Sequence, residues 1–280
     1  MFDKDVVKYL EGKARDLRRN VVYSVGVNYP GHIGGSFSAA DVMAALYFHK
    51  MKHDPQNRYM ADRDRVILSK GHIAILQYSA LAEAGYFPKE ELRDTKQLYS
   101  MLQGHPDLIK SGHIGIEAGT GSLGQGLSIG CGMALGLRMD NNPATTYVIM
   151  GDGELAEGQN WEAAMAAARF GLDNLVAIVD KNDKQAQGTI EGRFSLGSIA
   201  DKWRAFGWNV LEIDGHDMED ILKGLYAAGE AKGVPSVIVS STVKGKGLDF
   251  SEAHPVGFHN APLTQEQYDA AMAVFSGEEN

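Results

Sequence analysis

Cysteine is almost absent from the sequence: Cys131 is the only one, so no disulfide can form within the chain. A single thiol is consistent with a reducing compartment. Because Cys131 lies among glycines, we expect its side chain to have a packing role. Long apolar runs are missing too, since none reaches the 18 residues typical of a membrane-spanning helix. The charged segment Met1–Arg19 lacks the apolar core of a signal peptide. We therefore expect a cytoplasmic protein without membrane spans.

Positive charge is also in short supply. The formal net charge is −9, with 27 Lys and Arg against 36 Asp and Glu. Without a basic excess, a general nucleic-acid surface is not expected, and any anionic ligand must be held locally. Hydrophobic residues make up 44% of the chain, and apolar runs alternate with helical stretches. This alternation predicts a single α/β domain over residues 1–280, with a doubly wound, mostly parallel sheet flanked by helices.

The chain is organised around one strand-helix-strand unit. The apolar run Tyr147–Met150 stops at a Gly-Asp-Gly turn, which puts Asp152 at the end of a buried strand. Strong helix formers fill Gln159–Phe170, and a second apolar run, Leu175–Val179, leads to Asn182. A right-handed crossover makes the two strands parallel, so both end at the same edge of the sheet. Asp152 and Asn182 are therefore expected to lie close together.

These two side chains offer oxygen ligands. Magnesium prefers octahedral oxygen coordination and often shares it with phosphates and water, so a carboxylate, an amide and a backbone carbonyl can hold a magnesium diphosphate. Gly153 would let the backbone approach a phosphate, and the N-terminus of the following helix points the same way. A lone Gly-Asp-Gly is most often only a turn. The second strand ending in Asn182 favours cofactor binding.

The rest of the chain continues the alternation. Residues 29–35 predict a turn-rich loop, and Ser38 is expected to be the N-cap of the helix that follows it. We expect helices over Met1–Val27, Ser38–Phe48, Ile73–Ala84, Ser198–Phe206, Asp217–Ala228 and Thr264–Phe275. We expect further strands over Arg65–Leu68, Trp208–Ile213 and Ser236–Val243. The polar segment Asp183–Phe194 is expected to lie over the site.

A glycine-rich segment, Gly119–Gly126, opens a helix that ends at Leu137. It contains a formal G-x-G-x-x-G, but a loop precedes it instead of an apolar strand, so dinucleotide binding is not expected. The small residues instead imply close packing or close approach to a ligand.

Histidine follows glycine more often than the composition would give by chance. The pairs place imidazoles on tight loops, where they can donate or accept protons near neutral pH. A solvated turn is the alternative at each position, and we favour it for His216, which lies between a strand and a helix; His113 and His254 stay open. The five histidines that follow glycine are His32, His72, His105, His113 and His216.

Several motifs, in order, resemble the transketolase family. They run from about Gly31 to Pro262 and match its N-terminal, diphosphate-binding domain. The motifs are GHIGGS with His32, SKGHIA with His72, QGHPD with His105, EAGTGSLGQG, the GDG unit, and FHNAPL with His259. The resemblance implies a thiamine diphosphate-binding fold and the transfer of a two-carbon ketol unit from a ketose to an aldose, with the cofactor as electron sink.

The resemblance also implies roles for individual residues. The metal, Mg²⁺ or Ca²⁺ or Mn²⁺ in its place, would be bound by Asp152, Asn182 and the backbone carbonyl of Lys184. The diphosphate would contact Gly153, His72 and His259, and the cofactor rings would lie along Gly121 and Leu123. The catalytic histidines would be His32, His72, His105 and His259, of which His32, His105 and His259 bind substrate. Glu157, counted with the cofactor site, and Glu162 resemble the acids that link paired cofactor sites.

Whole transketolases carry two further domains, of which one binds the aminopyrimidine ring and provides an activating glutamate. The resemblance therefore implies the N-terminal subunit of a split enzyme, active only with a C-terminal partner subunit in a heterotetramer, on sugar or sugar-phosphate substrates. The sequence departs from the family pattern at four places, which are Lys184–Gln187, Ile33, Ser122 and Asn260. The alternatives are a 1-deoxyxylulose-5-phosphate synthase-like or oxo-acid dehydrogenase-like component, or a non-catalytic cofactor-binding subunit.

Overall fold

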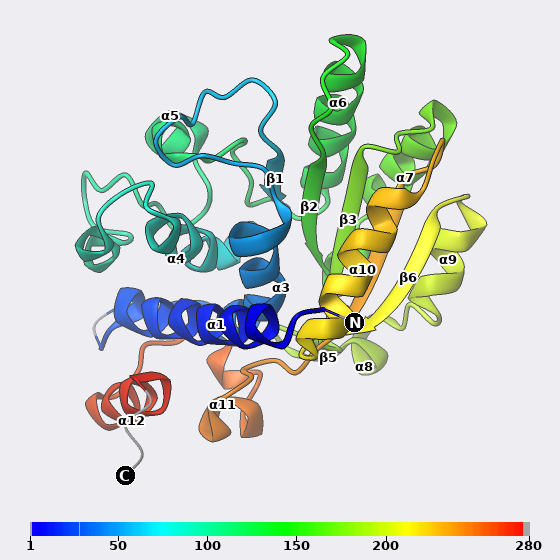
Figure 1. Cartoon of the computed structure of the whole chain (residues 1–280). Coiled ribbons are helices and arrows are strands. Elements are labelled where there is room, and N and C mark those ends of the chain that lie inside the picture. Colours follow the sequence, from blue (N-terminus) through cyan, green and yellow to red (C-terminus); the bar gives the residue numbers. More distant parts are fainter. Residues whose placement is uncertain (1, 28, 277–280) are drawn as a thin grey trace.

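Five parallel strands form the central sheet of the computed structural model, which describes residues 2–27 and 29–276 (Figure 1). The predicted limits at Met1 and Asn280 lie outside the described residues. The strand order is β1-β2-β3-β7-β6, so the last strand in sequence is inserted beside β3. The strands are β1 (Arg65–Leu68), β2 (Thr146–Gly151), β3 (Leu175–Lys181), β6 (Asn209–Asp214) and β7 (Ser236–Ser241). The predicted parallel sheet is confirmed, and all carboxyl ends meet at one edge.

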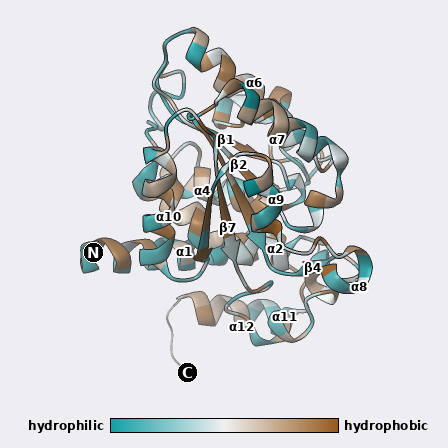
Figure 2. Cartoon of the chain, turned by 90° about the vertical axis from the view of Figure 1, so that its right-hand side faces the viewer, coloured by the Kyte–Doolittle hydropathy of each residue, from teal (hydrophilic) through white to brown (hydrophobic). Residues whose placement is uncertain are grey.

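Helices cover both faces of this sheet because its strands are apolar on both sides. In β2, Tyr147 and Ile149 pack into one core, whereas Val148 and Met150 pack into the other. The first core contains α1 (Lys4–Val25), α3 (Ala40–Ala45), α4 (Ala74–Ala84) and α10 (Met218–Glu230). The second contains α6 (Gln125–Met139), α7 (Gly158–Phe170) and α9 (Ile199–Ala205). Figure 2 shows the hydrophobic strands enclosed between these layers.

The expected helix from Ser38 to Phe48 is wrong at its start. A short helix, α2 (Ile33–Ser38), already begins inside the predicted loop and ends at Ser38. The Ser38 hydroxyl caps nothing: it donates to the carboxylate of Asp180 at 2.6 Å and reaches the carbonyl of Gly35 at 3.1 Å. A new helix, α3, then runs into a π-helical turn over Leu46–Lys50. A long-range hydrogen bond has thus overridden the local capping preference of serine.

The described part of the chain has further elements besides the sheet and these helices. They are α5 (Leu108–Ser111), the hairpin of β4 (Lys184–Gln185) and β5 (Gly188–Thr189), α8 (Ile190–Phe194), α11 (Asp249–Ala253) and α12 (Gln265–Ser276). The expected capping box of α12 is present, since Thr264 and Gln267 exchange side-chain to backbone hydrogen bonds of 3.0 and 3.2 Å. Within residues 2–27 and 29–276, no helix combines the length and apolarity needed to cross a bilayer.

Glycines in α6 let this helix approach the sheet closely. A Cβ on Gly130 would lie 2.5 Å from Cγ2 of Val148 in β2. Two residues further along the helix, Gly132 faces open space. Cys131 lies between them, donates its thiol to the carbonyl of Ala163, and has its pKa raised to about 12 by burial. The expected packing role of this cysteine agrees with these contacts.

The two glycines provide a matched test of this packing. We expect Gly130→Ala to lower the free energy of unfolding of the chain by about 1–3 kcal/mol, because Val148 cannot move away inside a filled core. Gly132→Ala should raise it by up to about 1 kcal/mol, because alanine is the better helix former and meets no neighbour. Denaturant unfolding of both variants checks this. Equal effects of the two substitutions would contradict the close contact.

Candidate functional site

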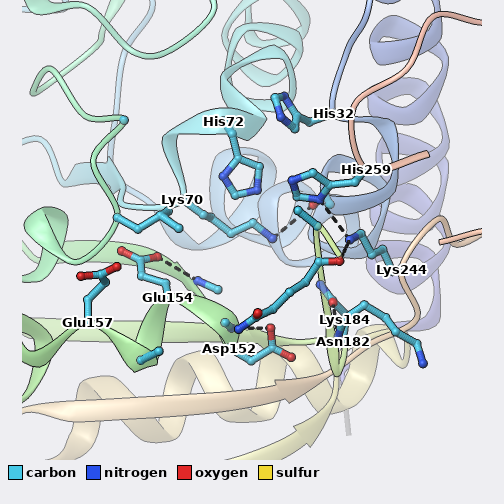
Figure 3. Close-up of a pocket in the computed structure, with 18 residues that line it drawn as sticks. His32, Lys70, His72, Asp152, Glu154, Glu157, Asn182, Lys184, Lys244 and His259 are labelled. Atoms are coloured by element: carbon cyan, nitrogen blue, oxygen red, sulfur yellow. Dashed lines mark hydrogen bonds between the residues drawn. The ribbon is translucent and has the colours of Figure 1, made fainter. Parts of the chain in front are cut away.

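A cavity of about 520 Å³ opens at the carboxyl edge of the sheet. Its lining comes from segments that follow β1, β2, β3 and β7, and from the loops that carry His32 and His259. A backbone bridge between Gly31 and Ala261 joins these two loops, with N–H···O distances of 3.2 and 3.3 Å. Figure 3 shows the rings of His32 and His259 next to each other and beside His72.

The register of β2 and β3 brings the two predicted metal ligands together. Gly151 pairs with Asp180, so the residues after each strand, Asp152 and Asn182, both reach the cavity. Asp152 accepts hydrogen bonds from the backbone N–H groups of Gly153 and Asp183 at 2.7 and 2.6 Å. The side-chain oxygen of Asn182 accepts one from the N–H of Lys184 at 3.1 Å. Gly153 and Lys184 line the same cavity.

A buried ion pair supports the floor of this site. Asp180 is only 3% exposed and accepts hydrogen bonds from Lys70, Ser38, Thr242 and the Asn182 amide. Burial alone would raise the pKa of Asp180, but Lys70 holds it below its usual value. The hydrogen bond from Asn182 Nδ2, at 3.1 Å, leaves the amide oxygen on the other side of the group. The ion pair thereby orients the proposed metal ligand.

Three histidine rings gather on the opposite wall. The ring centre of His32 lies 5.0 Å from that of His72 and 5.1 Å from that of His259. Burial and the charge of Lys70 lower the pKa of His72 to about 2. Burial and neighbouring positive groups lower the pKa of His32 to about 3 and that of His259 to about 4. All three rings are therefore neutral at pH 7, and each offers one N–H donor and one acceptor nitrogen for hydrogen bonds.

The fourth predicted histidine lies apart from this group. His105 does not line the main cavity; it lines a neighbouring hollow with Gln103–Ile109 and Gly119. Its ring lies against Gly121, where an added Cβ would be 3.2 Å from the ring carbon Cδ2. Because Gly121 itself lines the main cavity, His105 lies just outside its wall. Leu123 and Glu157 line the cavity, and Glu162 is exposed on α7.

Sequence reasoning missed the lysines and one carboxylate of the site. Lys70 stands beside His72 in a motif that drew attention only to the histidine. Lys244 reaches Nδ1 of His259 at 3.1 Å and the carbonyl of Gln185 at 3.2 Å, and burial lowers its pKa to about 8. Glu154 is 2% exposed and accepts hydrogen bonds from Ser69 and from the N–H groups of Gly124 and Gly151. No local pattern marks a lysine or glutamate as buried.

His216 corrects another interpretation. It was expected to be a solvated turn residue, yet its side chain is only 14% exposed. Its Nδ1 lies 2.8 Å from the Asp41 carboxylate, which is 175 positions away in sequence. The contact could not be inferred from the local Asp-Gly-His-Asp sequence.

The cavity fits a metal diphosphate by its charge. Burial and the nearby Asp180 raise the pKa of Asp152 to about 6, so these surroundings disfavour the charged form of Asp152, which a bound cation would favour. On the other wall, Lys70, Lys244 and the three histidines leave a surplus of hydrogen-bond donors for an anion. A cation bound at Asp152 and Asn182 that carries two phosphoryl groups would satisfy both sides.

Acid should destabilise the chain through its three neutral histidines. Unfolded histidine takes up a proton near pH 6.5, whereas these rings stay neutral in the folded state down to pH 4 or below. Stability present above pH 6.5 is therefore lost as the pH falls toward 4. Asp152 has the opposite effect on stability. Because its pKa is raised, the folded state takes up a proton near pH 6, before the unfolded state does, and this favours folding as the pH falls.

We expect His32→Gln and His259→Gln to flatten this dependence. Unfolding at pH 4.5 should take up about one proton fewer for each histidine replaced. Denaturant unfolding at pH 7 and pH 4.5 measures the difference. His113→Gln is the control, because His113 is exposed. A pH dependence that is the same in all variants would contradict the neutral state of the rings.

Comparisons with known proteins agree with this site. Residues 13–278 match the family model described as "Transketolase, thiamine diphosphate binding domain". A 6-deoxy-6-sulfo-D-fructose transketolase subunit of Clostridium sp. (strain MSTE9) is 45% identical over 269 residues, which are 96% of this chain and 97% of that one. An apulose-4-phosphate transketolase subunit of Phocaeicola vulgatus is 42% identical, over 96% of this chain and 95% of its own length.

Solved structures give the same result. Transketolase from Leishmania mexicana superposes with a TM-score of 0.85 at 31% identity, covering 96% of this chain. A variant of the Pichia stipitis enzyme in complex with fructose 6-phosphate superposes with a TM-score of 0.88 at 30% identity, covering 97% of this chain. This chain spans only 41% and 42% of those two chains. The chain belongs to the transketolase family and corresponds to its thiamine diphosphate-binding domain.

Proposed function

We propose that the chain is the cofactor-binding subunit of a two-chain, cytoplasmic transketolase that uses thiamine diphosphate and Mg²⁺. The observation that carries the proposal is the convergence of Asp152, Asn182 and three histidines in one cavity at the carboxyl edge of the sheet. Two relatives of nearly the same length are named as transketolase subunits, which supports a division of the enzyme between two chains.

In this proposal different residues of the cavity hold the metal, the diphosphate and the cofactor rings. Asp152, Asn182 and the backbone carbonyl of Lys184 hold the metal, and Gly153, His72 and Lys244 face the diphosphate. Gly121 and Leu123 lie along the rings. When bound, thiamine diphosphate supplies the nucleophilic carbon and the electron sink that ketol transfer requires.

We assign proton transfer to the histidines of the cavity. The neutral rings of His32 and His259 are in edge-to-face contact, 5.1 Å apart between centres, so both can reach hydroxyl groups of one sugar bound beside them. A neutral imidazole can take a hydroxyl proton from the donor and return it to the acceptor. His105, beside Gly121 and outside the main cavity, is assigned to a part of the substrate that extends into the neighbouring hollow.

The partner subunit completes the site. Large apolar side chains are exposed on α6 and α7, where Met139, Met165 and Phe170 are 76%, 52% and 52% exposed. Methionine and phenylalanine are enriched at protein interfaces, so these side chains are available for contact with a second chain. We assign to the partner the pyrimidine-binding domain with its activating glutamate, and to the assembly a heterotetramer in which Glu157 and Glu162 lie between paired cofactor sites.

The donor is proposed to be a ketose that carries an anionic group. The relatives named above are a sulfofructose and an apulose-4-phosphate transketolase subunit, and a sulfonate and a phosphate are both anions. Lys96 offers a cation on the side of His32 and His105: a Cβ on Gly104, the residue before His105, would lie 3.6 Å from Cε of Lys96, and the charge of Lys96 lowers the pKa of both histidines. Its ammonium otherwise donates to the carbonyl of Pro30 at 2.6 Å.

A carboxylate substitution tests the function. We expect Asp152→Asn to lower ketol transfer by at least about 100-fold in the complex with its partner, sought first among products of neighbouring genes, because a metal ligand loses its charge. Asp183→Asn is the matched control, because its carboxylate is 62% exposed and points to Lys181. Assays compare sulfonated, phosphorylated and uncharged ketose donors, with chelator added in one arm. Full activity without divalent metal, or in Asp152→Asn, would remove the proposal.

A further inference from the structure

We infer that His216 is a positioning residue that fixes the loop after β7 and thereby holds Lys244 in the cofactor cavity. The inference rests on the proposed function only for the identity of the ligand that Lys244 faces. His216 itself is absent from the cavity lining, since it lies behind the loop at the ends of β6 and β7. It acts on the site through the backbone of Val243.

The hydrogen bonds of His216 fix its tautomer. The backbone N–H of Val243 donates to Nε2 at 2.8 Å, and since an N–H can only donate, Nε2 carries no proton. The neutral ring then has its proton on Nδ1, which donates to the Asp41 carboxylate at 2.8 Å. The ring is therefore used at both nitrogens, and it links two segments that are far apart in sequence.

Asp41 is itself anchored in the core. Arg18 of α1 binds both of its oxygens, at 3.1 and 2.5 Å, and also donates to the carbonyl of Phe37 at 2.9 Å. Arg18 and Asp41 are each 8% exposed. Although burial opposes ionisation, Arg18 and His216 hold the pKa of Asp41 below its usual value. The network thus joins α1 and α3, which contribute to the core on one face of the sheet, to the loop after β7.

The loop after β7 has little freedom once this contact is made. A Cβ on Gly215, in the loop after β6, would lie 2.4 Å from Cγ2 of Thr242, so the two loops pack backbone to side chain. On the other side, the N–H of Gly245 donates to the carbonyl of Gly34 at 3.0 Å. Lys244 lies between these two fixed points and extends to His259 and Gln185. Its burial, at 3% exposure, makes its position depend on the backbone that carries it.

Two substitutions separate positioning from general stability. His216→Leu removes both hydrogen bonds, whereas His216→Gln keeps one donor and one acceptor on a single amide. The control is His113→Leu, a second histidine after glycine, which is exposed. Amide hydrogen exchange of residues 242–246 in the isolated chain, compared with β2 and β3, reports on the loop without any cofactor. Titration of the two-chain complex with thiamine diphosphate and Mg²⁺ reports on the site.

We expect His216→Leu to speed exchange at residues 242–246 at least about tenfold with β2 and β3 unchanged, and to weaken cofactor binding about tenfold. Activity at saturating cofactor should fall less than about threefold, and His216→Gln should restore most of the binding. Wild-type exchange in His216→Leu, or equal loss of protection across the sheet without rescue by glutamine, would overturn the inference. A wild-type complex that binds no cofactor would instead refute the proposed function, and the exchange measurement would still decide the contact.

Discussion

The buried carboxylate of Asp180 is the interaction on which the site depends. It accepts hydrogen bonds from four segments: the end of α2, the turn after β1, the loop after β3 and the loop after β7. Each of these segments also contributes to the cavity or leads into it. A buried charge is costly unless every lone pair is satisfied, so the four segments are held to one arrangement. The sheet provides the edge, and Asp180 determines how the loops assemble on it.

Burial and neighbouring charges penalise the ionised forms of the groups that line the same site. Burial and mutual repulsion lower the pKa values of His32, His72, His259 and Lys244. Burial and the charge of Asp180 raise the pKa of Asp152. A ligand with a cation at one end and anionic oxygens at the other removes both penalties. Binding of such a ligand therefore stabilises the fold as well as filling the cavity. Functional sites commonly trade stability in this way.

Local signals in the sequence were sufficient to predict the central strand-helix-strand unit. The apolar runs of β2 and β3, with glycine at the strand end and after the helix, predicted the parallel pair and the proximity of Asp152 and Asn182. Side chains whose role is set by a distant partner were not predictable. Ser38 was expected to cap a helix but bonds Asp180, 142 positions away, and His216 was expected to be solvated but bonds Asp41. Lys70 was overlooked because a lysine is normally exposed.

The position of β7 in the sheet has a consequence for biosynthesis. Because β7 lies between β3 and β6, a nascent chain that has emerged only as far as β6 has no neighbour to receive that strand. Until residues 236–241 leave the ribosome, β3 exposes an unpaired hydrogen-bonding edge and β6 has no place to attach. The N-terminal strands can pair early, but the sheet closes in a late step that inserts one strand between two others. During that interval the growing polypeptide is most open to chaperones and to wrong strand pairing.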